Sequence, residues 1–303
     1  MQTFIKIVLL SAVLSLAACK KERDGETILK GSATVLVDET LLPIIEDQVA
    51  VFESDYDAKI TLMPRSEAEA VQALFKDSAQ VIILPRNLSD AEREVFASRK
   101  IYPESSKIGT DAIALIANSR HQDTIIALAE IVAFMKGDRT SQTIKGLVFD
   151  NLNSSTVRVI SERANVDSVP QNDIYSFRTN EEVIKFIAEN SGMIGVVGIN
   201  WLTQPNPESA DIIRKIKILS VKDINGDKYY YPSQNNLAEG TYPLARDLYI
   251  VNAQSFSGLG VGFSTFIAGD RGQRIILKSG LLPVRIPSRQ IMTRKQLETK
   301  NNN

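Results

Sequence analysis

The chain has 303 residues, with 35 lysine and arginine residues against 36 aspartate and glutamate residues and a net charge of −1. This balance, without a basic stripe interleaved with aromatic residues, argues against nucleic acid as the main partner. A hydrophobic content of 44% is that of a globular protein. One histidine and one cysteine are too few for a zinc site of these residues or for Cys–His or Ser–His catalysis. We therefore expect no enzyme, no metal and no cofactor.

The N-terminus has the three parts of a secretory signal: a cation at Lys6, an apolar run at 7–16, and small residues before Cys19. The run is shorter than the roughly 20 residues that a helix needs to cross a bilayer. Leu16-Ala17-Ala18-Cys19 resembles the lipobox of bacterial lipoproteins, in which the cysteine is lipidated and cleavage falls just before it. We expect removal of residues 1–18 and a lipid anchor on Cys19 in a membrane of the cell envelope, facing the periplasm or the cell surface. An ordinary signal peptide with a chance cysteine is the alternative.

Charged and polar segments flank the rest of the chain. Residues 19–26 are almost all charged, which predicts a solvated tether, with a sorting signal as the alternative. Residues 289–303 are polar and end in three asparagines, and we expect a frayed tail there.

Between these segments, apolar runs bounded by turn residues alternate with segments of helical periodicity. In chain order we expect strand 33–37, helix 42–54, strand 59–63, helix 66–77, strand 80–84, helix 90–98, strand 112–117, helix 126–135, strand 147–150, helix 155–164, helix 180–190, strands 193–198, 216–219 and 248–251, and helices 258–269 and 270–279. This alternation predicts an α/β fold with mainly parallel sheets. Several strands are apolar throughout, as in sheets that are covered on both faces.

The junctions between strands and helices are the places to look for a ligand, because open α/β sheets bind ligands beyond the carboxyl ends of their strands. Here these junctions carry Thr40, Ser66 and the run Asn153-Ser154-Ser155-Thr156. Helix N-termini offer unpaired N–H groups and about half a positive charge, so several of them together can trap an anion. Each residue can also be an ordinary N-cap. The successive hydroxyls of the run exceed what one cap needs.

Six segments carry a further pattern. They read QVIILPRNLSD at 80–90, IGTDAIALIAN at 108–118, NSST at 153–156, IGVVG at 194–198, YPLARDLY at 242–249, and GQRII with SGLLP over 272–283. In this order they resemble the segments SRPL, YDGIAV, GSGT, IGY, YPLSR and GQ…GP of phosphate-type periplasmic binding proteins, the solute receptors of phosphate ABC importers. The resemblance implies a type II periplasmic-binding-protein fold, with two α/β lobes joined by two crossover strands and the anion enclosed between them.

The same resemblance implies a division of the chain. Lobe one would comprise residues 27–118 with 248–288, and lobe two residues 119–247, with crossings near 117–120 and 243–248. We expect a monomer whose partners are phosphate or a similar oxyanion and an ABC permease or other membrane protein.

The resemblance also implies a binding site. Its expected ligand-binding residues are Glu39, Thr40, Ser66, Arg86, Asp111, Asn153, Ser154, Ser155 and Thr156. Their hydroxyl and backbone N–H groups would donate to the anion, and Arg86 would add a charge-assisted contact. Asp111 would orient Arg86 or accept a proton from the ligand, a role that suits phosphate and repels sulfate. A buried ion pair between Arg86 and Asp111 is the alternative, and Arg158 is expected on a solvated helix face.

The sequence departs from the family where the anion would bind. Asn153 and Ser155 replace the loop glycines, and Asp150 stands where many members carry an arginine. Asp38 and Glu39 precede Thr40, and two acidic residues are unusual next to a site that binds a dianion. Two functions therefore stay open. One is a membrane-anchored receptor that presents phosphate to an ABC importer; the other is a lipoprotein of the same fold that acts as an interaction, sensing or assembly factor without transport.

Overall fold

The computed structural model describes residues 26–170, 172–203, 205 and 209–287. The predicted signal peptide (1–18), the predicted lipidation site Cys19, residues 20–25 of the tether and the tail from 289 lie outside the described residues. Within the described ranges, no helix combines the length and the apolar character needed to cross a membrane.

A ten-stranded sheet runs through the molecule in the order β2-β1-β3-β12-β4-β8-β6-β7, and β9 and β13 pair with β4 beside this path. Its strands are β1 (Gly31–Asp38), β2 (Ala58–Arg65), β3 (Val81–Leu84), β4 (Glu104–Asn118), β6 (Gly146–Phe149), β7 (Ile174–Ser176), β8 (Met193–Gly198), β9 (Ile216–Ile218), β12 (Ala245–Asn252) and β13 (Leu282–Pro283). A three-stranded sheet contains β5 (Ile125–Ala127), β10 (Ser220–Lys222) and β11 (Tyr229–Tyr230).

The helices include all eight that the sequence predicts. These are α2 (Leu42–Asp55), α3 (Glu67–Phe75), α4 (Asp90–Ser98), α5 (Leu128–Met135), α6 (Ser155–Ala164), α7 (Asn180–Glu189), α11 (Leu259–Ala268) and α12 (Asp270–Lys278). Shorter helices are the 3-10 turn η1 (Glu39–Leu41), α8 (Asn200–Thr203), α9 (Ala210–Ile213) and α10 (Gln234–Ala238). Side-chain oxygens of Ser66, Ser154 and Thr179 accept backbone hydrogen bonds in the first turns of α3, α6 and α7 and so fix where these helices begin.

The prediction of mainly parallel sheets is wrong for the middle of the molecule. β1 pairs in parallel with β2 and β3, and β6 pairs in parallel with β7 and β8. In contrast, β4 and β12 pair antiparallel with each other and with β8 and β3 respectively. The reason is that the chain passes along β4 in one direction and returns along β12 in the other.

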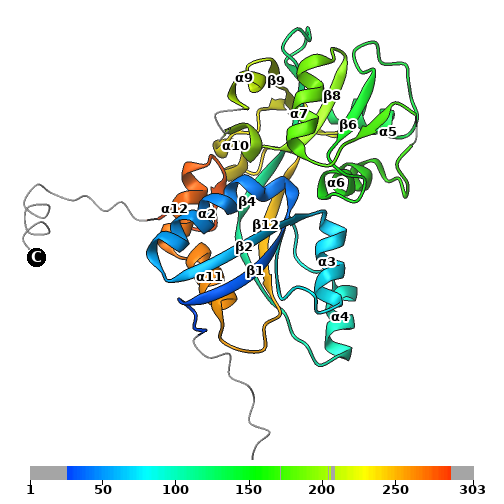
Figure 1. The fold of residues 1–303 in the computed structure, drawn as a ribbon. Coiled ribbons are helices and arrows are strands. Elements are labelled where there is room, and N and C mark those ends of the chain that lie inside the picture. Colours follow the sequence, from blue (N-terminus) through cyan, green and yellow to red (C-terminus); the bar gives the residue numbers. More distant parts are fainter. Residues whose placement is uncertain (1–25, 171, 204, 206–208, 288–303) are drawn as a thin grey trace, which may run out of the picture.

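Two α/β lobes share the long strand β4. Its residues up to Ala112 pair with β12 and β13, and those from Ile113 pair with β8 and β9. Figure 1 shows β1, β2, α3 and α4 gathered at one end of β4 and β12, and β6, β8, α5 and α7 at the other. This confirms the predicted fold class of two lobes joined by crossover strands. Strand β4 changes partners between Ala112 and Ile113, earlier in the chain than the predicted crossing near 117–120.

Apolar side chains bury the shared strand on both faces. Ile113, Ala114, Leu115, Ile116 and Ala117 are all 0% exposed. Full burial of a Leu or Ile side chain stabilises the fold by roughly 1.5–3 kcal/mol. The centre of the molecule is therefore a densely buried apolar strand, and the polar groups described below lie where its neighbouring strands end.

Candidate functional site

A buried polar cluster lies where the carboxyl ends of β1 and β6, which belong to different lobes, face each other. We call it the interlobe cluster; its members are Asp38, Glu39, Thr40, Asp111, Asp150, Ser154, Ser155, Thr156, Asn180, Asn200 and Arg246. Each of these residues is at most 8% exposed. Polar side chains remain buried to this degree when they bond to one another, and the contacts below follow that rule.

Asp38 is the acceptor at the centre of the cluster. It ends β1 and caps η1, and its Oδ1 accepts a hydrogen bond from the backbone N–H of Thr40 at 3.0 Å. The same oxygen accepts from Ser155 Oγ at 3.2 Å and from Thr40 Oγ1. Three donors from both lobes therefore converge on one carboxylate oxygen.

Arg246 lies behind the two hydroxyl groups. Its Nη1 donates to Ser155 Oγ at 2.7 Å and its Nη2 to Thr40 Oγ1 at 2.8 Å. Its Nε and Nη2 also donate to Asp111 Oδ2, at 3.2 and 2.8 Å, and this fixes the plane of the guanidinium. Each hydroxyl accepts from Arg246 and donates to Asp38, so both O–H bonds are directed at the central oxygen.

Asn180 joins the lobes on the other side of the cluster. It begins α7, and its backbone N–H and its Nδ2 donate to the Glu39 carboxylate of the opposite lobe. Its Oδ1 accepts from the backbone N–H of Gly198 at 2.9 Å. Asp150 follows β6 and accepts from Thr156 Oγ1 at 2.6 Å. The acidic residues that depart from the family thus have bonding partners within the cluster.

Lobe two also closes tightly over the turn η1. Asn200 Nδ2 donates to the Thr40 carbonyl at 2.8 Å, and Trp201 Nε1 donates to the Glu39 carbonyl at 3.3 Å. A Cβ atom on Gly198 would lie 2.6 Å from the Thr40 oxygen, so glycine is what lets β8 approach this backbone. The structure therefore shows the lobes in contact, with the cluster sealed between them.

Burial sets the protonation of the cluster. It raises the pKa of Asp38 to about 7 and that of Glu39 to about 8, and Arg246 lowers the pKa of Asp38 by less than burial raises it. Burial also raises the pKa of Asp111 and Asp150. Near neutral pH these carboxyl groups therefore hold protons more readily than exposed ones do. No group of three or more His, Cys, Asp or Glu side chains in the described residues is arranged to hold a metal ion.

Three acceptor atoms of the cluster stand apart from this network. Asp38 Oδ2, Asp111 Oδ1 and Asn200 Oδ1 are buried and have no hydrogen-bond partner among the described residues. A buried acceptor without a partner costs about 1–3 kcal/mol. Such atoms are suited to accept a hydrogen bond from a proton on a ligand.

The structure brings together most of the predicted site residues. Glu39, Thr40, Asp111, Ser154, Ser155 and Thr156 all lie in the interlobe cluster. Ser66 does not, because its hydroxyl forms a capping box with Glu69 at the start of α3. Asn153 is exposed, and its N–H donates to Asn151 Oδ1.

The prediction that Asp111 orients Arg86, and its alternative of an ion pair between the two, are both wrong. Arg86 donates to Glu67 Oε1 at 2.7 Å and to both oxygens of Glu92 at 2.7 and 2.8 Å. It follows β3 and is drawn to acidic residues in the first turns of α3 and α4. The partner of Asp111 is Arg246, which the sequence analysis missed as a site residue. Its position in the family-like segment YPLAR at 242–246 was the signal that could have identified it.

Arg158 was predicted to lie on a solvated helix face. The structure instead shows it connecting the two lobes at the edge of the cluster. From α6 it donates to Glu67 Oε1 at 2.8 Å and Oε2 at 3.1 Å. Glu67 belongs to α3 of the other lobe, is 4% exposed and also holds Arg86. Glu67 is therefore clamped by two arginines, one from each lobe.

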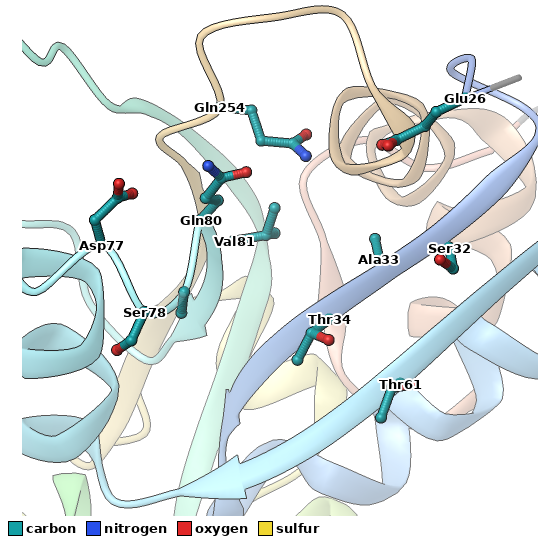
Figure 2. Close-up of a pocket in the computed structure, with 11 residues that line it drawn as sticks. Glu26, Ser32, Ala33, Thr34, Thr61, Asp77, Ser78, Gln80, Val81 and Gln254 are labelled. Carbon is teal, nitrogen blue, oxygen red and sulfur yellow. The ribbon is translucent and has the colours of Figure 1, made fainter. Parts of the chain in front are cut away.

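A separate cavity of about 360 Å³ lies at the opposite end of β1. Figure 2 shows Thr34, Gln80 and Gln254 around it, with Glu26 and Asp77 on its two sides. It adjoins the amino-terminal half of β1, whereas Asp38 ends that strand. Because α/β sheets bind ligands beyond the carboxyl ends of their strands, the interlobe cluster is the stronger candidate site.

Comparison with known proteins identifies the family of the chain. Residues 24–271 match a family described as the PBP superfamily domain. The phosphate-binding protein PstS of Pseudomonas aeruginosa is 20% identical over 299 residues, which span 90% of each chain. A structure from Clostridium perfringens, described as a phosphate ABC transporter substrate-binding protein with bound phosphate, has a TM-score of 0.70 at 17% identity, over 84% of this chain and 100% of that one. An ABC-type phosphate transport receptor from Vibrio cholerae has a TM-score of 0.63 at 15% identity, over the same shares of the two chains.

Proposed function

The chain belongs to the PBP superfamily, and from this premise we propose that it is a receptor that encloses phosphate or a similar oxyanion between its lobes. The observation that carries the proposal is the convergence of Thr40, Ser155 and Arg246. They come from lobe one, lobe two and a crossover strand, and both hydroxyls point at one acidic oxygen. Donors of this kind, which include a guanidinium, form charge-assisted hydrogen bonds to an oxyanion.

Asp111 would select among oxyanions. It holds Arg246 with one oxygen, and its other oxygen is buried without a partner in the described residues. Phosphate still carries a proton near neutral pH and can donate it to this oxygen. Sulfate has no proton there, so two acceptors would face each other. We propose that Asp111, set in place by Arg246, rejects sulfate in this way.

We further propose that the receptor is lipid-anchored at Cys19, acts in the cell envelope as a monomer and passes its ligand to an ABC permease. The P. aeruginosa and V. cholerae relatives are named for phosphate binding and phosphate transport, which supports this partner class. A tethered receptor stays near a membrane partner at high effective concentration. In this proposal the chain works without a cofactor and is not an enzyme.

A second candidate function is a lipoprotein that uses the same fold for interaction, sensing or assembly. The acidic character of the cluster favours it, because Asp38 and Glu39 already accept hydrogen bonds from donors that an anion would need. In addition, the lobes already touch through Asn180 and Asn200, so the closed shape is held by the chain itself.

Calorimetric titration of the detergent-solubilised full chain with phosphate and with sulfate, near pH 7, tests the proposed function. We expect heat of binding with phosphate and none with sulfate. The only tryptophan, Trp201, bonds to the Glu39 carbonyl across the lobes, so its fluorescence should change on phosphate addition. If the folded chain shows neither signal with phosphate, the receptor function is contradicted and the second candidate function is favoured.

A further inference from the structure

A carboxylate of the chain itself already engages the donors that we assign to an oxyanion. Asp38 Oδ1 accepts from the Thr40 N–H, from the Thr40 hydroxyl and from the Ser155 hydroxyl. Arg246 contacts both hydroxyls from behind, at 2.7 and 2.8 Å. Asp38 thus stands where one oxygen of a bound oxyanion would stand.

We propose that Asp38 is a built-in anionic ligand of the interlobe cluster, which an external oxyanion has to displace before it binds. This inference rests on the proposed function, because it assigns the same donors to both ligands. Two consequences follow. Asp38 sets the affinity of the site for phosphate, and a site freed of Asp38 accepts a small carboxylate as well as phosphate.

An ordinary helix cap does not account for these contacts. The caps Ser66 and Ser89 bond only to the first turn of their own helices, through Glu69 and Glu92. Asp38 does cap η1 through the Thr40 N–H, but it also accepts from Ser155, which is 117 residues away in the other lobe. One oxygen therefore serves the cap and the contact between lobes, as the oxygen of an enclosed ligand would.

The environment of Asp38 makes its displacement feasible. Its second oxygen, Oδ2, has no partner among the described residues, so the carboxylate is held through one oxygen only. Arg246 attracts the charge of Asp38. Glu39, Glu67 and Asp150 repel it. An external anion and an ionised Asp38 cannot share these donors, because like charges so close repel each other.

Substitution Asp38→Ala in the detergent-solubilised full chain tests the inference, with Asp247→Ala as the matched control. Asp247 lies on β12 next to Arg246 but bonds to Lys107 and Thr110 outside the cluster. The probes are formate, acetate and phosphate. Their binding is detected by thermal unfolding and by the fluorescence of Trp201. All three anions should raise the Tm of Asp38→Ala, because a ligand that binds only the folded state stabilises it. Formate and acetate should leave the wild type and Asp247→Ala unchanged.

Phosphate should bind Asp38→Ala at least about tenfold more tightly than it binds the wild type, a gain of about 1.4 kcal/mol. An Asp38→Ala chain that unfolds cooperatively but responds to none of the three anions would overturn the inference. If that variant does not fold, Asp38→Asn, which keeps the size and removes the charge, should show the same gain for phosphate. Unchanged phosphate affinity in the Asn variant would also overturn it.

The outcomes separate the inference from the proposed function. If Asp38→Ala binds anions and the wild type does not bind phosphate, the inference is supported and the receptor function is contradicted. If the wild type binds phosphate and neither Asp38 variant binds it more tightly, the receptor function is supported and the inference is contradicted.

Discussion

Substitution Arg246→Met is expected to lower the free energy of unfolding by about 3–5 kcal/mol, the cost of leaving one member of a buried ion pair without its partner. The side chains of Arg246 and Asp111 are 4% and 0% exposed, so water cannot replace the lost contact. The variant also removes the guanidinium N–H groups that donate hydrogen bonds to Thr40 and Ser155. Equilibrium unfolding in urea measures the loss.

A double variant tests the reason for this loss. In Arg246→Met with Asp111→Leu no charge is left unpaired, and most of the stability should return, since apolar pairs often replace buried ion pairs without cost. Arg214→Met is the control, because Arg214 pairs with Asp211 at 75% and 85% exposure and should contribute less than about 1 kcal/mol. A double variant as unstable as the single one would contradict the ion-pair explanation.

The free energy of unfolding is expected to fall as the pH rises from about 5 to about 9. The pKa of Asp38 is raised to about 7 and that of Glu39 to about 8 in the folded chain, whereas both lie near 4 when unfolded. The folded state therefore binds more protons over this range, and stability decreases with pH. The loss should reach several kcal/mol, on the order of 1.4 kcal/mol for each unit of pKa shift. Urea unfolding at a series of pH values measures it.

Two variants assign the decrease of stability with pH to Asp38 and to Glu39. Asp38→Asn should remove the part of the fall centred near pH 5 to 7, and Glu39→Gln the part that extends to about pH 8. Below pH 5 the opposite slope is expected, because Glu69 and Glu92 have lowered pKa values and lose stabilising contacts on protonation. Stability that stays constant or rises between pH 5 and 8 would contradict the raised pKa values of Asp38 and Glu39.

The sequence predicted the framework because its signals are local. Apolar runs such as 112–117 and capped helices such as α3 and α7 are specified by residues next to one another. The strands that it missed, among them β10 and β11, have only two or three residues, too few for a period to show. The antiparallel pairing of β4 and β12 depends on the path of the whole chain, which no single window of sequence contains.

The candidate site was predictable only in part. Thr40 and Ser155 follow strands that end at the interlobe cluster, and family resemblance marks the segment that contains Ser155. Arg86 also follows such a strand, but Glu67 and Glu92 pair with it and draw it away from the cluster. The contact between Asp38 and Ser155 spans 117 residues, and nothing local distinguishes a carboxylate that binds across the lobes from one that caps a turn.

The most direct test of the oxyanion site compares the phosphate affinity of Thr40→Val and Thr34→Val by calorimetry on the full chain. Both residues are threonines near β1, but Thr40 lies in the interlobe cluster and Thr34 is exposed near the opposite end of the strand. Loss of a hydrogen bond to a charged group costs about 1.5–3 kcal/mol. We therefore expect Thr40→Val to weaken phosphate binding by about tenfold or more and Thr34→Val to bind like the wild type. Equal affinities in the two variants would contradict the assignment of the anion to the interlobe cluster.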